Sequence, residues 1–389
     1  MKDARIEINW KKKIKSMVGG LMLPLSAGVI AFITGCGSGT MVTPKTTTTT
    51  PVPVTPTITK ALWVANGTNV LEYLPSQLSS TTASMVPHLV NNSGAFGAPQ
   101  GVTFDAAGDL WVIDGGTVAA GGTVAPALYE FTPEQLANLS KVNNPTPNIT
   151  INSAEFVFPQ QAVFDTTGNL WVSDNGGNAV FVFTAAQLEA TSTNAMPNVS
   201  ITSTPAFSGP LGITFDAMGD LWVANNASTT IFEFQAAHLP GVTTGAATNA
   251  AVMLTPDVTL SDNGNGSIQA PWTLIFDANG DLWSSNANAP NTVVEFAKAK
   301  LNISGSPNPA VTLSPTIVAG NSTLAAPNGI AFDNLGDLAA ISSATPFGSA
   351  FFAQKQLVAG GAVSPGVFLV GGATTLNAPA GCNFGPAVE

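Results

Sequence analysis

Aspartate recurs at one position of a repeated motif, and carboxylates at a fixed spacing are the first residues to consider for acid–base chemistry. The motif occurs as FDAAGDLW, FDTTGNLW, FDAMGDLW, FDANGDLW and FDNLGDLA, with the aspartates Asp105, Asp165, Asp216, Asp277 and Asp333. Catalysis needs one asymmetric group of residues, whereas a turn needs the same residue each time. Aspartate accepts hydrogen bonds from the backbone two residues on, and the following glycine allows a positive φ. We therefore interpret these aspartates as turn residues.

The remaining residues with obvious chemistry are few. The chain has two histidines, His88 and His238, and two cysteines, Cys36 and Cys382. Both histidines occupy outer segments of the repeats, so we expect surface side chains rather than a catalytic base. Cys382 occupies the strand position that holds Val102 in another copy, so we expect a buried thiol that packs as a small hydrophobic residue.

A second set of polar residues follows the strand that contains the repeated tryptophan. One such residue ends that strand in every copy, and the set consists of Asn66, Asp114, Asp174, Asn225, Asn286 and Ser342. Asparagine, aspartate and serine favour turns because their side chains bond to nearby backbone groups. We expect these residues to cap the next turn; a polar ring on one face of the fold is the alternative.

The elements that position these residues are short strands. Gly212 to Phe234 contains three apolar segments separated by polar breaks, which predicts three strands joined by tight turns. Each copy continues with a short segment such as PEQL and then with an outer strand introduced by proline, such as PNITI. Four strands per repeat and a period of roughly 50 residues are typical of a propeller.

Six copies predict an all-β fold, a six-bladed β-propeller of four-stranded blades. The sixth copy is split, because ALWVAN opens the folded part at Ala61 and PAGCNF ends it at Pro379. We therefore expect the N- and C-terminal strands to share one blade and close the ring. The longest additions between copies lie around Thr117 to Ala127, Gly241 to Met253 and Asp262 to Gly266, and we expect them to be loops, which often carry binding residues.

The N-terminal residues have the composition of an export signal. Residues 1–35 combine four lysines at positions 11–15 with an apolar stretch from Met17 to Ile33. Residues 36–60 are rich in threonine and proline, which favours an extended tether, and residues 61–389 form the propeller. This division gives three expected domains.

The end of the signal, Ile33-Thr34-Gly35-Cys36, resembles the lipobox of bacterial lipoproteins. The resemblance implies that Cys36 is acylated and anchors the protein to a membrane. No aspartate follows Cys36, so the resemblance implies an outer-membrane or cell-surface lipoprotein. If cleavage is ordinary, a periplasmic or secreted protein is the alternative.

The charge of the chain excludes one class of partner. Six of the 12 basic residues and two of the 23 acidic residues lie in residues 1–35, which leaves 6 basic and 21 acidic residues in the rest. Arg5 is the only arginine. Nucleic acid requires a basic surface, so it is not an expected partner. We expect a monomer and no cofactor.

Each repeat combines P-x-G with FDxxGDLWV and a following Asn or Asp. This combination resembles the NHL-repeat and gluconolactonase-like six-bladed propellers, which include the senescence-marker and strictosidine synthase-like proteins. In gluconolactonases the middle residue of P-x-G helps to coordinate a divalent cation at the central channel. The equivalent residues here are Gln100, Gln160, Leu211, Trp272, Asn328 and Ala380. Only Asn328 matches that family, and the arginine typical of NHL repeats is absent, so we expect no metal. Streptogramin lyase is similar but relies on a histidine base.

The copies differ most at this middle position, which the resemblance places at the channel mouth. Trp272 with Gln100, Gln160 and Asn328 would form an aromatic platform edged by amides, which suits an uncharged ligand such as a glycan; a tryptophan that packs between blades is the alternative. We expect a surface-tethered, non-enzymatic binding or scaffold module for a glycan, polymer or protein. The alternative is a divergent propeller hydrolase or lyase with a degenerate central site, and a structural envelope protein is a third possibility.

Overall fold

The computed structural model describes residues 59–78, 86–119, 122–139, 144–242, 249–345, 347–358, 360–370 and 375–388. Residues 55–389 form one compact unit. The expected signal segment 1–35, Cys36 and the tether up to residue 58 lie outside the described residues. Within the described part of the chain, no helix is long and apolar enough to cross a membrane.

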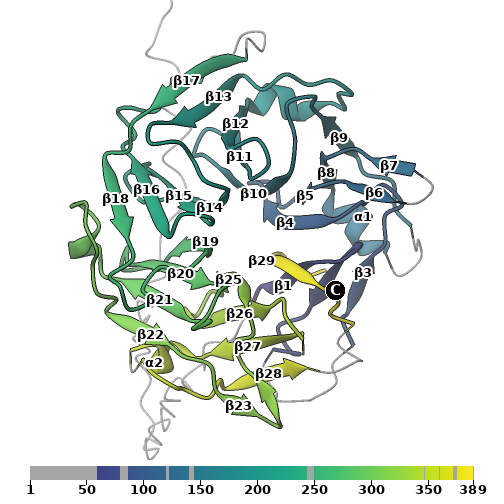
Figure 1. Ribbon diagram of the computed structural model, residues 1–389. Coiled ribbons are helices and arrows are strands. Elements are labelled where there is room, and N and C mark those ends of the chain that lie inside the picture. The colour runs from purple at the N-terminus through teal and green to yellow at the C-terminus, as the bar shows by residue number, and fades with distance from the viewer. Residues whose placement is uncertain are drawn as a thin grey trace, which may run out of the picture. The chain divides into compact units, whose positions relative to one another are not determined.

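Six sheets surround a common axis, and the four strands common to all of them are antiparallel, so the predicted six-bladed β-propeller is confirmed (Figure 1). Each blade has four strands in order from the axis outwards, and blade 3 has an additional fifth strand. From the inside out, blade 1 consists of β29 (Pro379–Gly385), β1 (Ala61–Asn66), β2 (Asn69–Tyr73) and β3 (Leu89–Asn91), and blade 2 consists of β4 (Pro99–Phe104), β5 (Leu110–Asp114), β8 (Ala127–Phe131) and β9 (Ile149–Asn152). Blade 3 consists of β10 (Pro159–Phe164), β11 (Leu170–Asp174), β12 (Ala179–Phe183), β13 (Val199–Ser203) and β17 (Ala250–Leu254), and blade 4 consists of β14 (Pro210–Phe215), β15 (Leu221–Asn225), β16 (Thr230–Phe234) and β18 (Val258–Ser261). Blade 5 consists of β19 (Pro271–Phe276), β20 (Leu282–Asn286), β21 (Val293–Phe296) and β22 (Val311–Leu313), and blade 6 consists of β25 (Pro327–Phe332), β26 (Leu338–Ser342), β27 (Gly348–Phe352) and β28 (Val367–Val370).

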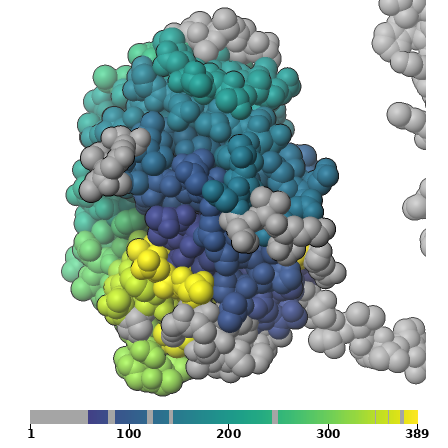
Figure 2. Space-filling view, turned by 90° about the vertical axis from the view of Figure 1, so that its right-hand side faces the viewer, coloured from purple at the N-terminus to yellow at the C-terminus, as the bar shows by residue number. Residues whose placement is uncertain are grey.

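Blade 1 is assembled from both ends of the propeller, as the split copy predicts. Strand β29 pairs antiparallel with β1, and the register places Ala61 opposite Gly385 and Val64 opposite Cys382. The C-terminal residues lie directly beside the first residues of the ring (Figure 2). Strands contributed by the two ends of the chain therefore close the ring by backbone hydrogen bonds.

The repeated aspartates lie in the turns that join the first two strands of five blades. The glycine of each turn has a φ between 79° and 88°, a conformation that glycine adopts without steric cost. In blade 2, the Asp105 carboxylate accepts hydrogen bonds from the backbone N–H groups of Ala107 and Asp109 at 2.9 and 3.0 Å. Equivalent pairs of bonds occur in the other four turns. The interpretation of these aspartates as turn residues is confirmed.

The blades pack through aromatic contacts between neighbours. The tryptophan of each second strand meets the phenylalanine of the next inner strand, with ring centroids 5.4 to 6.1 Å apart, in the pairs Trp63–Phe104, Trp111–Phe164, Trp171–Phe215, Trp222–Phe276 and Trp283–Phe332. Blade 6 has Ala339 at this position, and it packs in the same cluster as Phe384. The apolar core is therefore distributed between the blades rather than held in one centre.

Short helices follow the third strand in several blades. They are α1 (Pro133–Ala137), η2 (Ala185–Glu189), η3 (Lys298–Lys300) and α2 (Gln354–Leu357). The glutamine of the repeated QL segment has a structural role. In blade 2, Gln135 accepts from the Thr132 N–H at 2.9 Å and donates to the Thr146 carbonyl at 2.9 Å, which ties the helix to the start of the outer strand.

Two long additions between copies are not the plain loops that the sequence analysis expected. Residues 117–127 include a hairpin of β6 (Thr117–Ala119) and β7 (Gly122–Val124), and residues 250–254 form the fifth strand of blade 3. A second small hairpin, β23 (Ile317–Val318) with β24 (Asn321–Ser322), lies between blades 5 and 6 in the chain. Backbone pairing with an available partner strand explains why these residues form strands.

Candidate functional site

The inner strands approach one another closely around the axis. A Cβ added at Gly101 would lie 2.6 Å from the Gln160 carbonyl oxygen, and one at Gly381 would lie 2.6 Å from the Gln100 carbonyl oxygen. Added side chains at Gly212 and Gly329 would likewise collide with the neighbouring inner strand. The glycine of P-x-G is therefore required by packing, because no side chain fits between these backbones.

Strands β10 and β19 have Gln161 and Thr273 in place of this glycine, and these two side chains close the channel. Gln161 Nε2 donates a hydrogen bond to Thr273 Oγ1 at 2.8 Å, although their strands β10 and β19 are separated by β14 around the ring. Thr273 Oγ1 in turn donates to the Asn328 carbonyl at 2.6 Å. This layer of hydrogen bonds lies at the third position of P-x-G, next to the middle residues in each strand, and forms a floor under the channel mouth.

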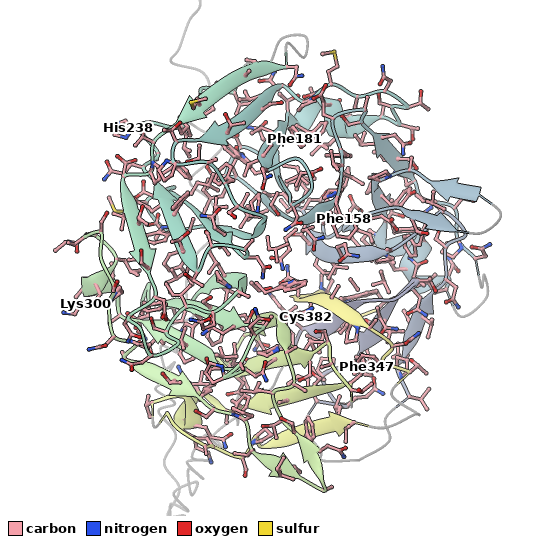
Figure 3. The ribbon with its side chains drawn as sticks, in the orientation of Figure 1. Phe158, Phe181, His238, Lys300, Phe347 and Cys382 are labelled. Atoms are coloured by element: carbon pink, nitrogen blue, oxygen red, sulfur yellow. The ribbon has the colours of Figure 1, made fainter. Side chains whose placement is uncertain are left out.

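A cavity of about 120 Å³ continues along the axis on the other side of this floor. Its walls are inner-strand residues such as Val102, Ile213, Leu274 and Cys382, and none of its lining residues is charged. Cys382 is half-buried rather than fully buried, because it borders this cavity, and it lies toward the axis in Figure 3. Desolvation raises the pKa of its thiol, so the thiol stays protonated at neutral pH. The expectation of a buried thiol is therefore corrected to a half-buried one.

The four candidate residues all lie at the start of inner strands, at one end of the ring. Gln100 is half-buried and donates from Nε2 to the Ala98 carbonyl at 3.1 Å, while Gln160 is 3% exposed. Trp272 is half-buried, and Asn328 is 6% exposed with an Oδ1 atom that has no hydrogen-bond partner among the described residues.

The ring divides these four residues into two pairs. Gln100 and Gln160 come from the adjacent blades 2 and 3, and Trp272 and Asn328 come from the adjacent blades 5 and 6. The equivalent residues of the blades between them are Leu211 and Ala380, which are apolar and buried. One side of the mouth therefore carries the amides of Gln100 and Gln160, and the opposite side carries the indole of Trp272 and the amide of Asn328.

Phe158 is a mouth residue that sequence reasoning missed. A Cβ added at Gly115 would lie 2.5 Å from Phe158 Cε2 and 3.3 Å from Gln100 Cγ, so this ring lies beside Gln100. Figure 3 shows Phe158 near the inner end of blade 3. The signal is visible in the sequence, because the residue before the repeated proline is alanine or glycine in the other five blades.

The residues that end the second strands explain why a bulky side chain is accepted there. In blade 3, the Asp174 carboxylate accepts hydrogen bonds from the N–H groups of Val157 and Phe158 at 2.9 and 3.0 Å. In the equivalent loop of blade 2, Asp114 accepts the corresponding bonds from Gly97 and Ala98. The asparagine or serine of the other blades accepts only one of these two bonds. In those four blades the residue before proline has a positive φ of 49° to 62°, which favours small residues.

These buried residues are structural, as the capping interpretation predicts. Asp114 also accepts from the Gly116 N–H at 2.7 Å and Asp174 from the Gly177 N–H at 2.7 Å, so each caps the next turn as well as the preceding loop. Burial raises the pKa of Asp114, and the backbone N–H groups of Ala98, Gly116 and Gly97 oppose this shift.

The histidines lie away from the mouth, as expected. His238 lies at the outer rim in Figure 3, and its Nδ1 is 2.8 Å from Asp257 Oδ1. That hydrogen bond and the charge of Asp257 raise the pKa of His238. His88 is exposed and precedes β3. Among the described residues no group of three or more His, Cys, Asp or Glu side chains could hold a metal ion.

Comparison with known proteins identifies the fold. No protein-family model matches the chain, and no curated protein is found to match it. Among solved structures, a Bacteroides caccae protein of unknown function shares 10% identity over 85% of this chain and 100% of its own, with a TM-score of 0.54. A chain of the nidogen/laminin complex shares 12% identity over 85% of this chain and 99% of its own, with a TM-score of 0.51.

Virginiamycin B lyase from Staphylococcus aureus shares 15% identity over 67% of this chain and 68% of its own, with a TM-score of 0.37. At these identities the similarities establish only the fold, and the lyase supports no argument about activity. The chain is a six-bladed β-propeller, and its function has to be argued from its own residues.

Proposed function

We propose that this propeller is a non-enzymatic binding module that takes an uncharged polar ligand, such as a glycan, at the channel mouth. The observation that carries this proposal is the pair Trp272 and Asn328 on adjacent inner strands. The indole of Trp272 is partly exposed, and an indole face stacks on the apolar face of a sugar ring. Asn328 Oδ1 is buried and has no hydrogen-bond partner in the described part of the chain, so a ligand hydroxyl would satisfy it.

The opposite side of the mouth supports the same ligand chemistry. Phe158 offers a second aromatic side chain, and Gln100 and Gln160 offer amide donors and acceptors. The floor of Gln161 and Thr273 is uncharged. These groups recognise neutral hydrogen-bonding ligands, and neither the candidate residues nor the floor includes a carboxylate or histidine that could act as a general acid or base. Binding is therefore favoured over hydrolysis at this site.

Glycan binding by residues 55–389 tests the proposal. We expect Trp272→Ala to weaken binding on a glycan array at least about tenfold, which corresponds to about 1.4 kcal/mol, and Trp272→Phe to retain part of it. Val358→Ala is the matched control, because Val358 is 80% exposed and borders a groove beside the turn of Asp277. A wild-type protein that binds no glycan, or equal binding by Trp272→Ala, would remove the proposal.

We also propose that acylated Cys36 anchors the protein to the outer membrane or cell surface. The support is the sequence Ile33-Thr34-Gly35-Cys36 at the end of the apolar stretch from Met17 to Ile33, which resembles the lipobox of bacterial lipoproteins. Incorporation of labelled palmitate that is lost in Cys36→Ala is expected, and an unmodified soluble wild-type protein would contradict it.

A further inference from the structure

In several blades, one residue from the next repeat in the chain pairs with the outer edge strand. Ser192 bridges to Ile151 of β9, Gly305 to Leu260 of β18, and Gly361 to Leu313 of β22, each in parallel orientation. At β9, for example, the Ser192 N–H donates to the Thr150 carbonyl and the Asn152 N–H donates to the Ser192 carbonyl, both at 2.9 Å. One residue therefore occupies the open edge of each of these outer strands, and exposed edges are otherwise a site for pairing with another chain.

Blade 3 differs because a whole strand covers its edge. Strand β17 pairs parallel with β13 over five residues, from Val199 opposite Ala250 to Ser203 opposite Leu254. The Ala250 N–H donates to the Asn198 carbonyl at 3.1 Å, and the Leu254 carbonyl accepts from the Thr204 N–H at 2.8 Å. In a parallel ladder alternate residues bond to the partner strand. Residues 250, 252 and 254 therefore bond inwards, and residues 251 and 253 present their backbone groups outwards.

This leaves an open edge at the outside of the molecule, where β17 is the outermost strand of blade 3 (Figure 1). The backbone N–H and C=O groups of Ala251 and Met253 have no hydrogen-bond partner among the described residues. Ala251 is exposed, and Met253 is 70% exposed. Val252 and Leu254 pack instead against the apolar cluster of blades 3 and 4, so the strand is fixed in place.

The edge also lacks the features that usually prevent pairing. Charged side chains and prolines protect most natural edge strands. Residues 241–256 contain no charged residue, although the chain beyond residue 35 has 21 acidic residues, and the five residues of β17 are all apolar. Two copies of this acidic domain would repel each other at most surfaces, so a neutral edge is a favourable place for them to meet.

We propose that β17 pairs antiparallel with β17 of a second copy of this chain, around a two-fold axis at Val252. In this register Ala251 lies opposite Met253 of the second copy, and Met253 lies opposite Ala251 of the second copy. The outward groups of both residues then form four reciprocal hydrogen bonds, and none remains unpaired. A two-fold contact of this kind uses both edges completely, so assembly stops at the dimer. This proposal differs from the sequence-based expectation of a monomer, which stays a prediction.

Sedimentation of residues 55–389 tests this interface, since these residues form one compact unit. We expect the wild type to be a dimer at high micromolar concentration. Met253→Lys places a charge on the open edge and is expected to weaken dimerisation at least about tenfold. Met218→Lys is the matched control, because Met218 is 79% exposed in the turn of blade 4, and it should leave the dimer intact. A monomeric wild type, or a dimer unaffected by Met253→Lys, would overturn the proposal.

Two further variants test the register. Met253→Pro removes an outward N–H group and leaves the bonds to β13 in place, so it should give a folded monomer with an unchanged Tm within a few degrees. The double variant Ala251→Cys with Met253→Cys should form a cross-linked dimer on mild oxidation, because hydrogen-bonded antiparallel pairs have Cα atoms about 5.5 Å apart, within disulfide range. A dimer that forms no such cross-link would show that another surface is used.

Discussion

Blades 3 and 4 share the same four inner strands and the same turn but have different side chains around the turn tryptophan. In blade 3, Trp171 Nε1 donates to Asp165 at 3.0 Å, and the residue opposite Trp171 on the next strand is Val182. In blade 4, Trp222 Nε1 has no partner among the described residues, and the residue opposite it is Glu233. Glu233 is 4% exposed, and its Oε2 atom also has no partner.

The difference shows that the same backbone turn forms whether or not the polar side chains packed against it have hydrogen-bond partners. Asp165 receives five hydrogen bonds, three of them from side chains. Although burial acts in the opposite direction, the bonds from Trp171, Thr167 and Asn169 lower its pKa. By contrast, burial and the neighbouring carboxylates of Asp220, Asp257 and Asp216 raise the pKa of Glu233 to about 7. Blade 3 therefore gains stability from its turn, whereas blade 4 carries an unfavourable charge.

Removing the turn aspartate should give the largest difference between blades 3 and 4 in the free energy of unfolding. We expect Asp165→Ala to lower the free energy of unfolding by about 3 kcal/mol, because it leaves several donors without an acceptor. Asp216→Ala should cost only about 1.5 kcal/mol, because Asp216 accepts the two backbone bonds but not one from Trp222. Urea unfolding of residues 55–389 measures both values. Equal losses would show that the side-chain donors of blade 3 add nothing.

The raised pKa of Glu233 predicts an unusual dependence of stability on pH. Between pH 4.5, the value for an unperturbed glutamate, and about 7, the folded state binds more protons at Glu233 than the unfolded state does. The free energy of unfolding therefore falls as pH rises through this range and stays low above it. Burial raises the pKa values of Glu72 and Glu295 to about 7 as well, so they act in the same direction.

Glu233→Gln should remove this effect from blade 4. We expect the variant to be more stable than wild type by about 2 kcal/mol at pH 8, with little difference near pH 4.5. Glu189→Gln is the matched control, because Glu189 is an exposed residue of blade 3, and it should change stability little at either pH. Urea unfolding at both pH values measures the difference, and a variant less stable at pH 8 would contradict the assignment.

Replacing the turn tryptophan should give the smallest difference in stability between blades 3 and 4. Trp171→Phe removes a hydrogen bond to Asp165 and some packing, so it should cost about 1 kcal/mol more than Trp222→Phe. Trp222→Phe removes a buried N–H group that has no partner among the residues the structure describes, which offsets part of its packing loss. Thermal unfolding of the two variants ranks them. A larger loss for Trp222→Phe would indicate that its N–H group is hydrogen-bonded in solution.

The candidate site was only partly predictable from the repeats. Alignment of the copies located the middle residues of P-x-G, and Trp272 and Asn328 were recognised because they differ from the other copies. The separation of the mouth into two sides was not predictable, because it depends on where the buried residues Leu211 and Ala380 fall around the ring. The hydrogen bond from Gln161 to Thr273 joins residues from non-adjacent blades, so no local pattern predicts it.

The sequence by itself determined the number of blades, the position of each turn and the closure of the ring, because strand periodicity and turn chemistry act over a few residues and are repeated six times. Only the tertiary structure decided which buried carboxylate oxygens have no donor among the described residues, how the channel is closed, and that residues 250–254 lie against β13 as an open edge. Those features depend on contacts between residues far apart in the chain. Local propensity does not specify such contacts, whereas packing around the axis does.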